Sequence, residues 1–204
     1  MATFTTKTTG DSLLEKPLME WESAVLFGTD PLCPPEILQT LVLLDVDHLD
    51  SQGEKRTGQI VIHKDLAQEL LGLFEFMLQN HFPVAMIRPV SDPAFFSGGR
   101  PSDAISMRMN NSSGFNYRFI AGTNRLSWHA LGMAVDINPL WNPCFTAHGM
   151  EPSEGKYIPE RLGTLSLKHP VVEAFLDQGW VWGGNWKQIQ DYHHFEKPLQ
   201  QMQF

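Results

Sequence analysis

The sequence predicts a single α+β domain, in which a small antiparallel sheet with flanking helices carries long loops. Three observations favour this class. The 204 residues are 42% hydrophobic and 19% charged, so the chain can bury one core. Short strand-like runs outnumber the two helical patterns. Two polar stretches, 91–114 and 139–167, are longer than most loops of a compact domain, and they are where a functional site is expected.

The first part of the chain is expected to be a lead-in followed by a hairpin. Residues 1–35 are polar at the start and rich in proline at the end, so we expect a loosely ordered segment before a domain at 36–204. The apolar runs 41–46 and 59–62 are predicted to pair as strands, because the turn residues Asp50-Ser51-Gln52-Gly53 lie between them.

A helix and a strand are predicted next. Apolar residues at helical spacing indicate a helix that starts at Asp65 and ends before Pro83. Val84 to Val90 is predicted as a strand. The residues that define the helical face are Leu66, Leu70, Phe74, Met77 and Leu78.

The end of the chain is predicted to return to the sheet. Residues 169–176 indicate a short helix, with Pro170 in its first turn and Gly179 beyond its end. Residues 180–182 and 193–196 are predicted as closing strands.

Charge excludes several classes of partner. The chain has 15 Lys and Arg against 23 Asp and Glu, a formal net charge of −8, which argues against nucleic-acid binding and against a polybasic membrane anchor. No apolar run approaches the ~20 residues that a spanning helix needs. The first 17 residues lack the charged and apolar regions of a secretory leader. We expect a soluble monomer.

The cysteines, Cys33 and Cys144, are too few and too far apart for a disulfide framework or a cysteine-based zinc site. Two buried thiols are the favoured interpretation, and a single long-range disulfide is the alternative.

Two separate segments contain the residue types of a zinc site. Apolar residues alternate with polar ones through 133–138, so a strand there points Asp136 away from the apolar face, and a turn at Gly132 can bring His129 back toward it. Two histidines and one carboxylate form a common zinc ligand set with an open fourth position, and His194 completes that set. Asp191 precedes His194 by three residues, which is the place of a general base.

Each of these residues also has a structural interpretation. A single His or Asp in a strand is more often a surface group or a hydrogen-bonded structural one. Asp191 is then a turn residue, His193 a solvated neighbour, and Arg118 a surface cation or the partner of a structural acid.

The two motifs resemble those of the M15 zinc peptidases. Ser-x-His-x-x-Gly-x-Ala-x-Asp at 127–136 and Asp-x-x-His-Phe-Glu at 191–196 carry the resemblance, which runs from about residue 41 to 196. The family includes D-alanyl-D-alanine carboxypeptidases and dipeptidases, and L-alanyl-D-glutamate endopeptidases of bacteria and phages. Trp-Gly-Gly-Asn-Trp at 182–186 and the stretch 110–118 are closer to the endopeptidase branch, which is subfamily C of this family.

The resemblance implies a fold like that of the Hedgehog signalling domain and the DD-peptidases. It implies one Zn²⁺ bound by His129, Asp136 and His194, with Asp191 as the base. It also implies further roles around the metal. Ser127 is expected to orient its neighbours, and either Arg118, which we favour, or Arg88 is expected to face the scissile carbonyl; Trp128 and Trp186 line the groove or belong to the core.

The implied substrate is the stem peptide of peptidoglycan. We expect an L-alanyl-D-glutamate endopeptidase that acts in cell-wall degradation or remodelling, in the manner of an endolysin. The alternatives are a D-alanyl-D-alanine carboxypeptidase or dipeptidase, and a non-catalytic zinc-containing binding module. The substrate implies the cell wall or periplasm, although no leader is visible. The acidic net charge and the lack of a visible wall-binding domain oppose an enzyme that binds anionic wall polymers from outside.

Overall fold

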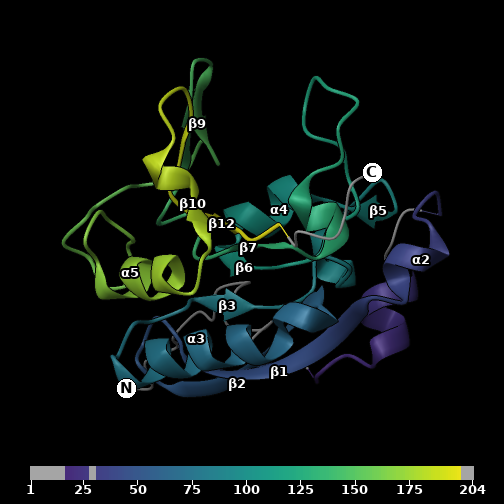
Figure 1. Ribbon diagram of the computed structural model, residues 1–204, viewed down its shortest axis with the longest axis horizontal. Helices are drawn as coiled ribbons and strands as arrows, with labels where there is room; N and C mark the ends of the chain where they lie inside the picture. Colours follow the sequence, from purple (N-terminus) through teal and green to yellow (C-terminus); the bar gives the residue numbers. More distant parts are fainter. Residues whose placement is uncertain (1–16, 28–30, 199–204) are drawn as a thin grey trace, which may run out of the picture.

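A long two-stranded hairpin forms one side of the molecule in the computed structural model, which describes residues 17–27 and 31–198 (Figure 1). Strands β1 (Leu41–Leu49) and β2 (Lys55–His63) pair antiparallel along their full length. In the turn between them, the buried carboxylate of Asp50 accepts the backbone N–H groups of Gln52 and Glu54, both at 2.9 Å. The predicted hairpin and its turn are confirmed. Both strands are longer than the apolar runs because the ladder continues through polar residues.

Helix α3 (Ala67–Gln79) packs against strand β1. Its buried face includes Leu70, Phe74 and Met77, and burying each such side chain contributes about 1.5–3 kcal/mol. The predicted helix is confirmed. Its first residue is Ala67 rather than Asp65, because Lys64–Leu66 forms a 3₁₀ turn that the side chain of His63 caps.

A second layer contains the short strands that carry the two motifs (Figure 1). Strands β10 (Val181–Trp182), β12 (His194–Glu196) and β7 (Ala134–Asp136) form an antiparallel sheet in that order. Helix α5 (Pro170–Asp177) packs against β10, and the ring of Phe175 stacks on that of Phe195 at 4.0 Å. The predicted closing strands and C-terminal helix are thereby confirmed.

The first polar stretch is not the plain loop that its composition suggested. After β3 (Met86–Ile87) it contains the hairpin β4 (Phe96–Ser97) and β5 (Arg100–Pro101), helix α4 (Asp103–Arg108), and β6 (Asn111–Ser112), which pairs with β3. With α2 (Pro35–Leu38), the described residues hold four α-helices where the pattern predicted two. Helices of four and six residues are too short to display a helical period. The predicted strand 84–90 is likewise reduced to two residues.

The second polar stretch also contains strands. β8 (Cys144–Thr146) and β9 (Gly149–Glu151) form a hairpin, and β11 (Gln190–Asp191) joins it in the order β11-β8-β9. This hairpin projects from the second layer on one side of β7 and β12, and the segment 118–127 projects on the other (Figure 1). The observed architecture is a single α+β domain, as predicted. Its remaining short helices are a π-helix at Glu22–Phe27 and 3₁₀ helices at Pro93–Phe95, Trp128–Leu131 and Gly183–Asn185.

The described part of the lead-in, 17–27, packs against the domain. Ala24 and Val25 are buried, and the hydroxyl of Ser91 donates to the carbonyl of Ala24 at 2.6 Å. Residues 1–16 and 28–30 lie outside the described residues, so the boundary at residue 36 stays a prediction. Cys33 and Cys144 are both buried, and no disulfide joins them, as favoured. Across the described residues, no helix is long and apolar enough to cross a bilayer.

Candidate active site

His129 is held by a capped helical turn. Ser127 caps the 3₁₀ helix that contains it, and the Ser127 hydroxyl accepts the backbone N–H of His129 at 3.3 Å. The ring Nδ1 of His129 lies 2.6 Å from the carbonyl oxygen of Gly114. Because a carbonyl only accepts, Nδ1 carries the hydrogen and Nε2 is left to face the site.

Gly132 ends this turn for two physical reasons. Its φ is +64°, a conformation that favours glycine. A Cβ there would also lie 2.6 Å from Leu41 Cδ2 and 2.7 Å from the backbone nitrogen of His63. The close approach of the turn to the hairpin therefore requires glycine. The sequence predicted the turn at this position but not the contact with the hairpin.

Asp136 and His194 face each other across the paired strands β7 and β12. His194 Nδ1 lies 3.0 Å from Asp136 Oδ1, and His129 Nε2 lies 3.2 Å from the same oxygen. The two imidazole nitrogens are 3.1 Å apart. All three side chains are buried. Two segments about sixty residues apart in sequence thus bring three ligand-type atoms to one point.

The donor set fits a cation. The outer nitrogen of His129 faces a carbonyl, and the outer nitrogen of His194, Nε2, lies 3.0 Å from Glu196 Oε2. With a hydrogen on each outer nitrogen, the inner nitrogens present lone pairs toward a carboxylate oxygen. Three lone pairs so close repel one another unless a cation or protons lie between them, and two imidazoles with one carboxylate suit zinc. Within the described residues, these three form the one group of His, Cys, Asp or Glu side chains that converges in this way.

Electrostatics in the protein without metal agree with this arrangement. Burial alone would raise the pKa of Asp136, but the charges of His129 and His193 hold it well below its usual value. Burial alone would lower the pKa of His194, but hydrogen bonds with Asp136 and Glu196 raise it to about 10. The cluster therefore binds positive charge strongly.

Asp191 lies at the edge of this cluster on strand β11. Its side chain is 17% exposed, and its buried Oδ1 lies 3.0 Å from Nε2 of His193. Burial would raise the pKa of Asp191, but the neighbouring His193 lowers it below its usual value. The same His193 nitrogen is 4.0 Å from Asp136 Oδ1, so both carboxylates lie near one imidazole nitrogen. An ionised Asp191 can act there as a base.

A glycine makes room for Asp191. A Cβ on Gly183 would lie 2.6 Å from the carbonyl oxygen of Asp191 and 2.9 Å from its Cβ. The Trp-Gly-Gly element at 182–184 thus packs its backbone directly against Asp191, a contact that the motif alone did not indicate.

His193 was missed as a site residue. The interpretation of His193 as a solvated neighbour is wrong, since its side chain is buried and its Nδ1 lies 2.7 Å from the carbonyl oxygen of Asn142. Burial lowers the pKa of His193, but Asp191 and Asp136 outweigh it and raise it to about 9. Adjacent strand residues normally point to opposite faces, but His193 precedes the strand and lies in a turn, so the alternation rule does not apply to it.

The two candidate arginines have different surroundings. Arg88 is buried, its Nε lies 2.6 Å from Asp92 Oδ2, and it also donates to the carbonyl of Pro17. Arg118 is 36% exposed along its side chain, and its Nε lies 3.1 Å from Asp103 Oδ2. Arg88 is thus buried and paired with Asp92 and Pro17, whereas the Arg118 side chain is partly exposed and lies beside an acid of helix α4.

The two candidate aromatic residues also differ in their surroundings. Trp186 is half-buried, and its ring centroid lies 5.4 Å from that of His194. Trp128 is half-buried and packs against the main hydrophobic core. Trp186 is therefore next to the ligand cluster, while Trp128 has a packing role.

Comparison with known proteins gives evidence about the class of protein. Residues 121–197 match an M15 peptidase family described as D-alanyl-D-alanine carboxypeptidase. The matched segment contains His129, Asp136, Asp191 and His194, and it begins after both candidate arginines. The match and the α+β fold together support an M15 peptidase. No curated protein and no solved structure matches the chain.

Proposed function

We propose that the protein is a zinc-dependent peptidase that cleaves peptidoglycan stem peptides between L-Ala and D-Glu. The observation that carries this proposal is the convergence of His129 Nε2, Asp136 Oδ1 and His194 Nδ1, with the carboxylate of Asp191 one imidazole away. The family match supports the peptidase chemistry. We assign the metal to the three converging residues.

The chemistry divides between the metal and the chain. A zinc ion held by these three residues would act as a Lewis acid, which polarises a carbonyl and lowers the pKa of water. Asp191 takes a proton from the attacking water and passes it to the leaving amine. Arg118 is the cation we assign to the developing oxyanion, because its side chain is the more exposed of the two. Trp186 forms a wall for the substrate next to His194.

Two observations support internal cleavage. The Trp-Gly-Gly-Asn-Trp element at 182–186 resembles the endopeptidase branch, and its Gly183 packs against the base. The hairpin β8–β9 and the segment 118–127 project on opposite sides of the strands that carry the ligands (Figure 1). Walls on two sides suit a peptide that continues in both directions from the scissile bond.

A D-alanyl-D-alanine carboxypeptidase is the second candidate, and the description of the matched family favours it. Such an enzyme binds the free carboxylate at the end of its substrate, which requires a cation close to the metal. Arg118 is the residue we would assign to that carboxylate.

The test is digestion of purified peptidoglycan by the zinc-loaded protein, with mass analysis of the products. Cleavage at L-Ala–D-Glu produces a new amino terminus on D-Glu. Release of D-Ala alone would refute the endopeptidase and favour the carboxypeptidase. Release of neither product, with one zinc per chain and the fold intact, would favour a binding module. Absence of zinc after purification without chelators would contradict the metal assignment.

A further inference from the structure

A cavity of about 330 Å³ lies between helix α4 and the end of the β8–β9 hairpin. Helix α4 contributes Met107 and Arg108, and the opposite wall contributes Met150, Glu151 and Glu154. This volume is at the lower end of the range for small-ligand pockets. The cavity is separate from the metal ligands, and the proposed reaction makes no use of it.

Its charged residues have opposite signs on opposite walls. Arg108 forms no ion pair or side-chain hydrogen bond with any described residue, and the same is true of Glu151. A hydrogen bond from Ser153 lowers the pKa of Glu154, and across the cavity the charge of Arg108 contributes to lowering it. Glu154 accepts a hydrogen bond from the Ser153 hydroxyl at 2.9 Å. Between these charges, the two methionines supply flexible apolar surface. An alkyl chain that ends in both an ammonium and a carboxylate complements such walls.

Strand register relates the cavity to the proposed base. Glu151 pairs with Cys144 across β9 and β8, and Cys144 pairs with Asp191 across β8 and β11. Neighbouring strands lie about 4.8 Å apart, so Glu151 and Asp191 are roughly 10 Å apart along the sheet. Burial raises the pKa of the Cys144 thiol, and the charges of Asp191 and Glu151 raise it further. Both carboxylates therefore lie near the same thiol, and the cavity adjoins the catalytic sheet.

We propose that this cavity binds the side chain of a diamino-dicarboxylic acid residue of the substrate. Arg108 would pair with the side-chain carboxylate, and Glu151 with Glu154 would pair with the ammonium. This proposal rests on the proposed function, and it specifies a stem peptide that contains a diamino-dicarboxylic acid. An extended peptide advances about 3.3–3.6 Å per residue, so roughly 10 Å corresponds to two or three residues from the scissile bond. In a stem peptide cut before D-Glu, the diamino acid is the second residue beyond that bond.

The test uses two synthetic stem tetrapeptides, L-Ala-γ-D-Glu-X-D-Ala, in which X is meso-diaminopimelate or L-Lys. We expect kcat/KM to be about tenfold higher for diaminopimelate, because only this residue supplies the carboxylate for Arg108. Arg108→Gln should abolish the preference and leave the Lys peptide unchanged. Glu151→Gln should lower kcat/KM for both peptides, since both carry the side-chain ammonium. Arg100→Gln, an exposed arginine on β5, is the matched control and should change neither.

Binding is measured in parallel, by calorimetry on zinc-loaded Asp191→Asn, which should bind both peptides without cleaving them. The same tenfold preference should appear in Kd, with thermal unfolding unchanged by Arg108→Gln. Equal kcat/KM and equal Kd for both peptides, with cleavage intact, would overturn the cavity assignment and leave the proposed function standing. Neither cleavage nor binding of either peptide would overturn both.

Discussion

At the scale of single residues, two oxygen atoms beside His193 restrict the orientation of its ring. Nδ1 faces the carbonyl of Asn142 at 2.7 Å, and Nε2 faces the carboxylate of Asp191 at 3.0 Å. The contact with Asn142 restrains the ring, and the ion pair keeps Nε2 of His193 beside Oδ1 of Asp191. In the proposed reaction, the other carboxylate oxygen would face the attacking water. If Asp191 is the base, as proposed, His193 is expected to position it.

We expect His193→Gln to retain zinc and to lower kcat on the order of tenfold, with little change in KM. A double-mutant cycle with Asp191→Asn separates positioning from general structural damage. If His193 acts through Asp191, its substitution should cost nothing further in the Asp191→Asn background. Additive losses in the cycle would contradict this role. His169→Gln, which changes a capping histidine at the start of α5, is the matched control.

Asp191 itself should be separable from the metal ligands. Asp191→Asn is expected to keep zinc and to lower kcat by ~10²–10⁴, the usual contribution of a positioned acid–base group. His129→Ala should lose zinc together with activity. Elemental analysis and steady-state kinetics on the same preparations distinguish the two effects. Loss of zinc from Asp191→Asn would make Asp191 a ligand, and Glu196 would become the next candidate for the base.

The sequence could predict the ligand types but not all of their surroundings. His129, Asp136 and His194 could be proposed because their spacing and strand alternation limit where they lie. The burial of His193 could not be predicted, because it depends on a contact with Asn142, a residue from a distant loop. The ion pair between Arg118 and Asp103 could not be predicted for the same reason, because helix α4 brings Asp103 to Arg118.

At the scale of elements, the 3₁₀ helix Gly183–Asn185 and strand β11 are fitted to each other. We expect Gly183→Ala to displace Asp191, because the new Cβ would lie 2.6 Å from the Asp191 carbonyl oxygen. The variant should retain zinc, because none of the three proposed ligands lies on β11, and should lose most of its kcat. Kinetics and metal content measure both effects.

Gly72→Ala is the control for that substitution. Gly72 lies on helix α3, and a Cβ there would meet nothing within 4 Å. Alanine in a helix interior is favoured over glycine by roughly 0.5–1 kcal/mol, so Gly72→Ala should raise stability slightly and leave kcat unchanged. An unaffected kcat in Gly183→Ala would mean that β11 tolerates the extra atom and that the packing does not position Asp191.

Elements with a long repeated pattern were predictable, and short ones were not. The hairpin β1–β2 and helix α3 each have enough residues for their alternation or helical period to show. Helix α4 has six residues, and its start depends on Ser102, whose hydroxyl accepts the N–H of Ile105. Such local capping within a polar segment gives no apolar period to detect.

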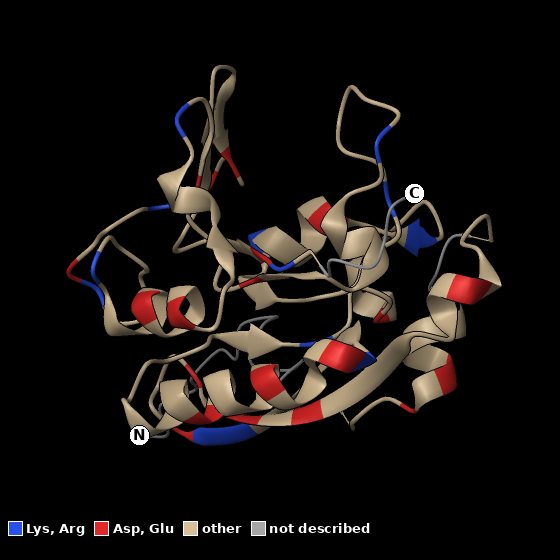
Figure 2. Cartoon of the chain, viewed as in Figure 1, with Lys and Arg blue, Asp and Glu red and all other residues tan. Residues whose placement is uncertain are grey.

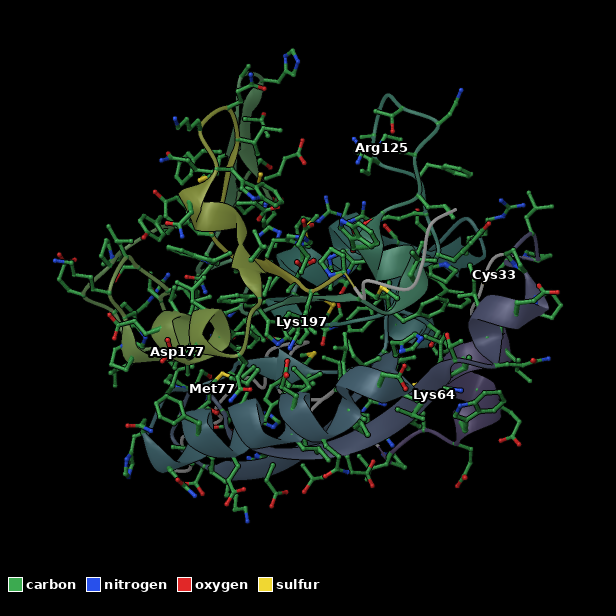
Figure 3. All side chains as sticks on the ribbon, viewed as in Figure 1. Cys33, Lys64, Met77, Arg125, Asp177 and Lys197 are labelled. Atoms are coloured by element: carbon green, nitrogen blue, oxygen red, sulfur yellow. The ribbon has the colours of Figure 1, made fainter. Side chains whose placement is uncertain are left out.

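At the scale of the whole molecule, the net charge of −8 is unevenly distributed. Acidic side chains are frequent on α2, β1, α3 and α5, while the segment 118–127 is basic (Figure 2). Between residues 93 and 135 the sequence has four arginines and a single acid, Asp103. One of these arginines, Arg125, lies on the projecting segment 118–127 (Figure 3). The acidic average is therefore a poor guide to the charge of the segment 118–127, which is expected to lie beside the proposed substrate.

The stability of the whole fold should depend on pH through His48, a buried residue of strand β1. Burial lowers its pKa from 6.5 to about 4, although Asp50 and Asp47 act in the opposite direction and Arg56 adds to the lowering. Below pH 6.5 the unfolded chain binds a proton at His48 that the folded chain does not. Stability therefore falls as the pH drops from about 6.5 to 4, by at most about 3 kcal/mol from this residue.

His48→Leu should remove this loss, because leucine has no proton to bind and fills a comparable buried space. Urea unfolding at several pH values measures the free energy of unfolding of both proteins. As the pH falls from 6.5 to 4, we expect this free energy to decrease more for the wild type than for His48→Leu. Comparing the two proteins cancels the contributions of His63 and His169, whose pKa values burial also lowers. Carboxylates with lowered pKa, such as Asp50, act below this window. A difference that stays constant across the window would show that folded His48 accepts a proton as readily as unfolded His48.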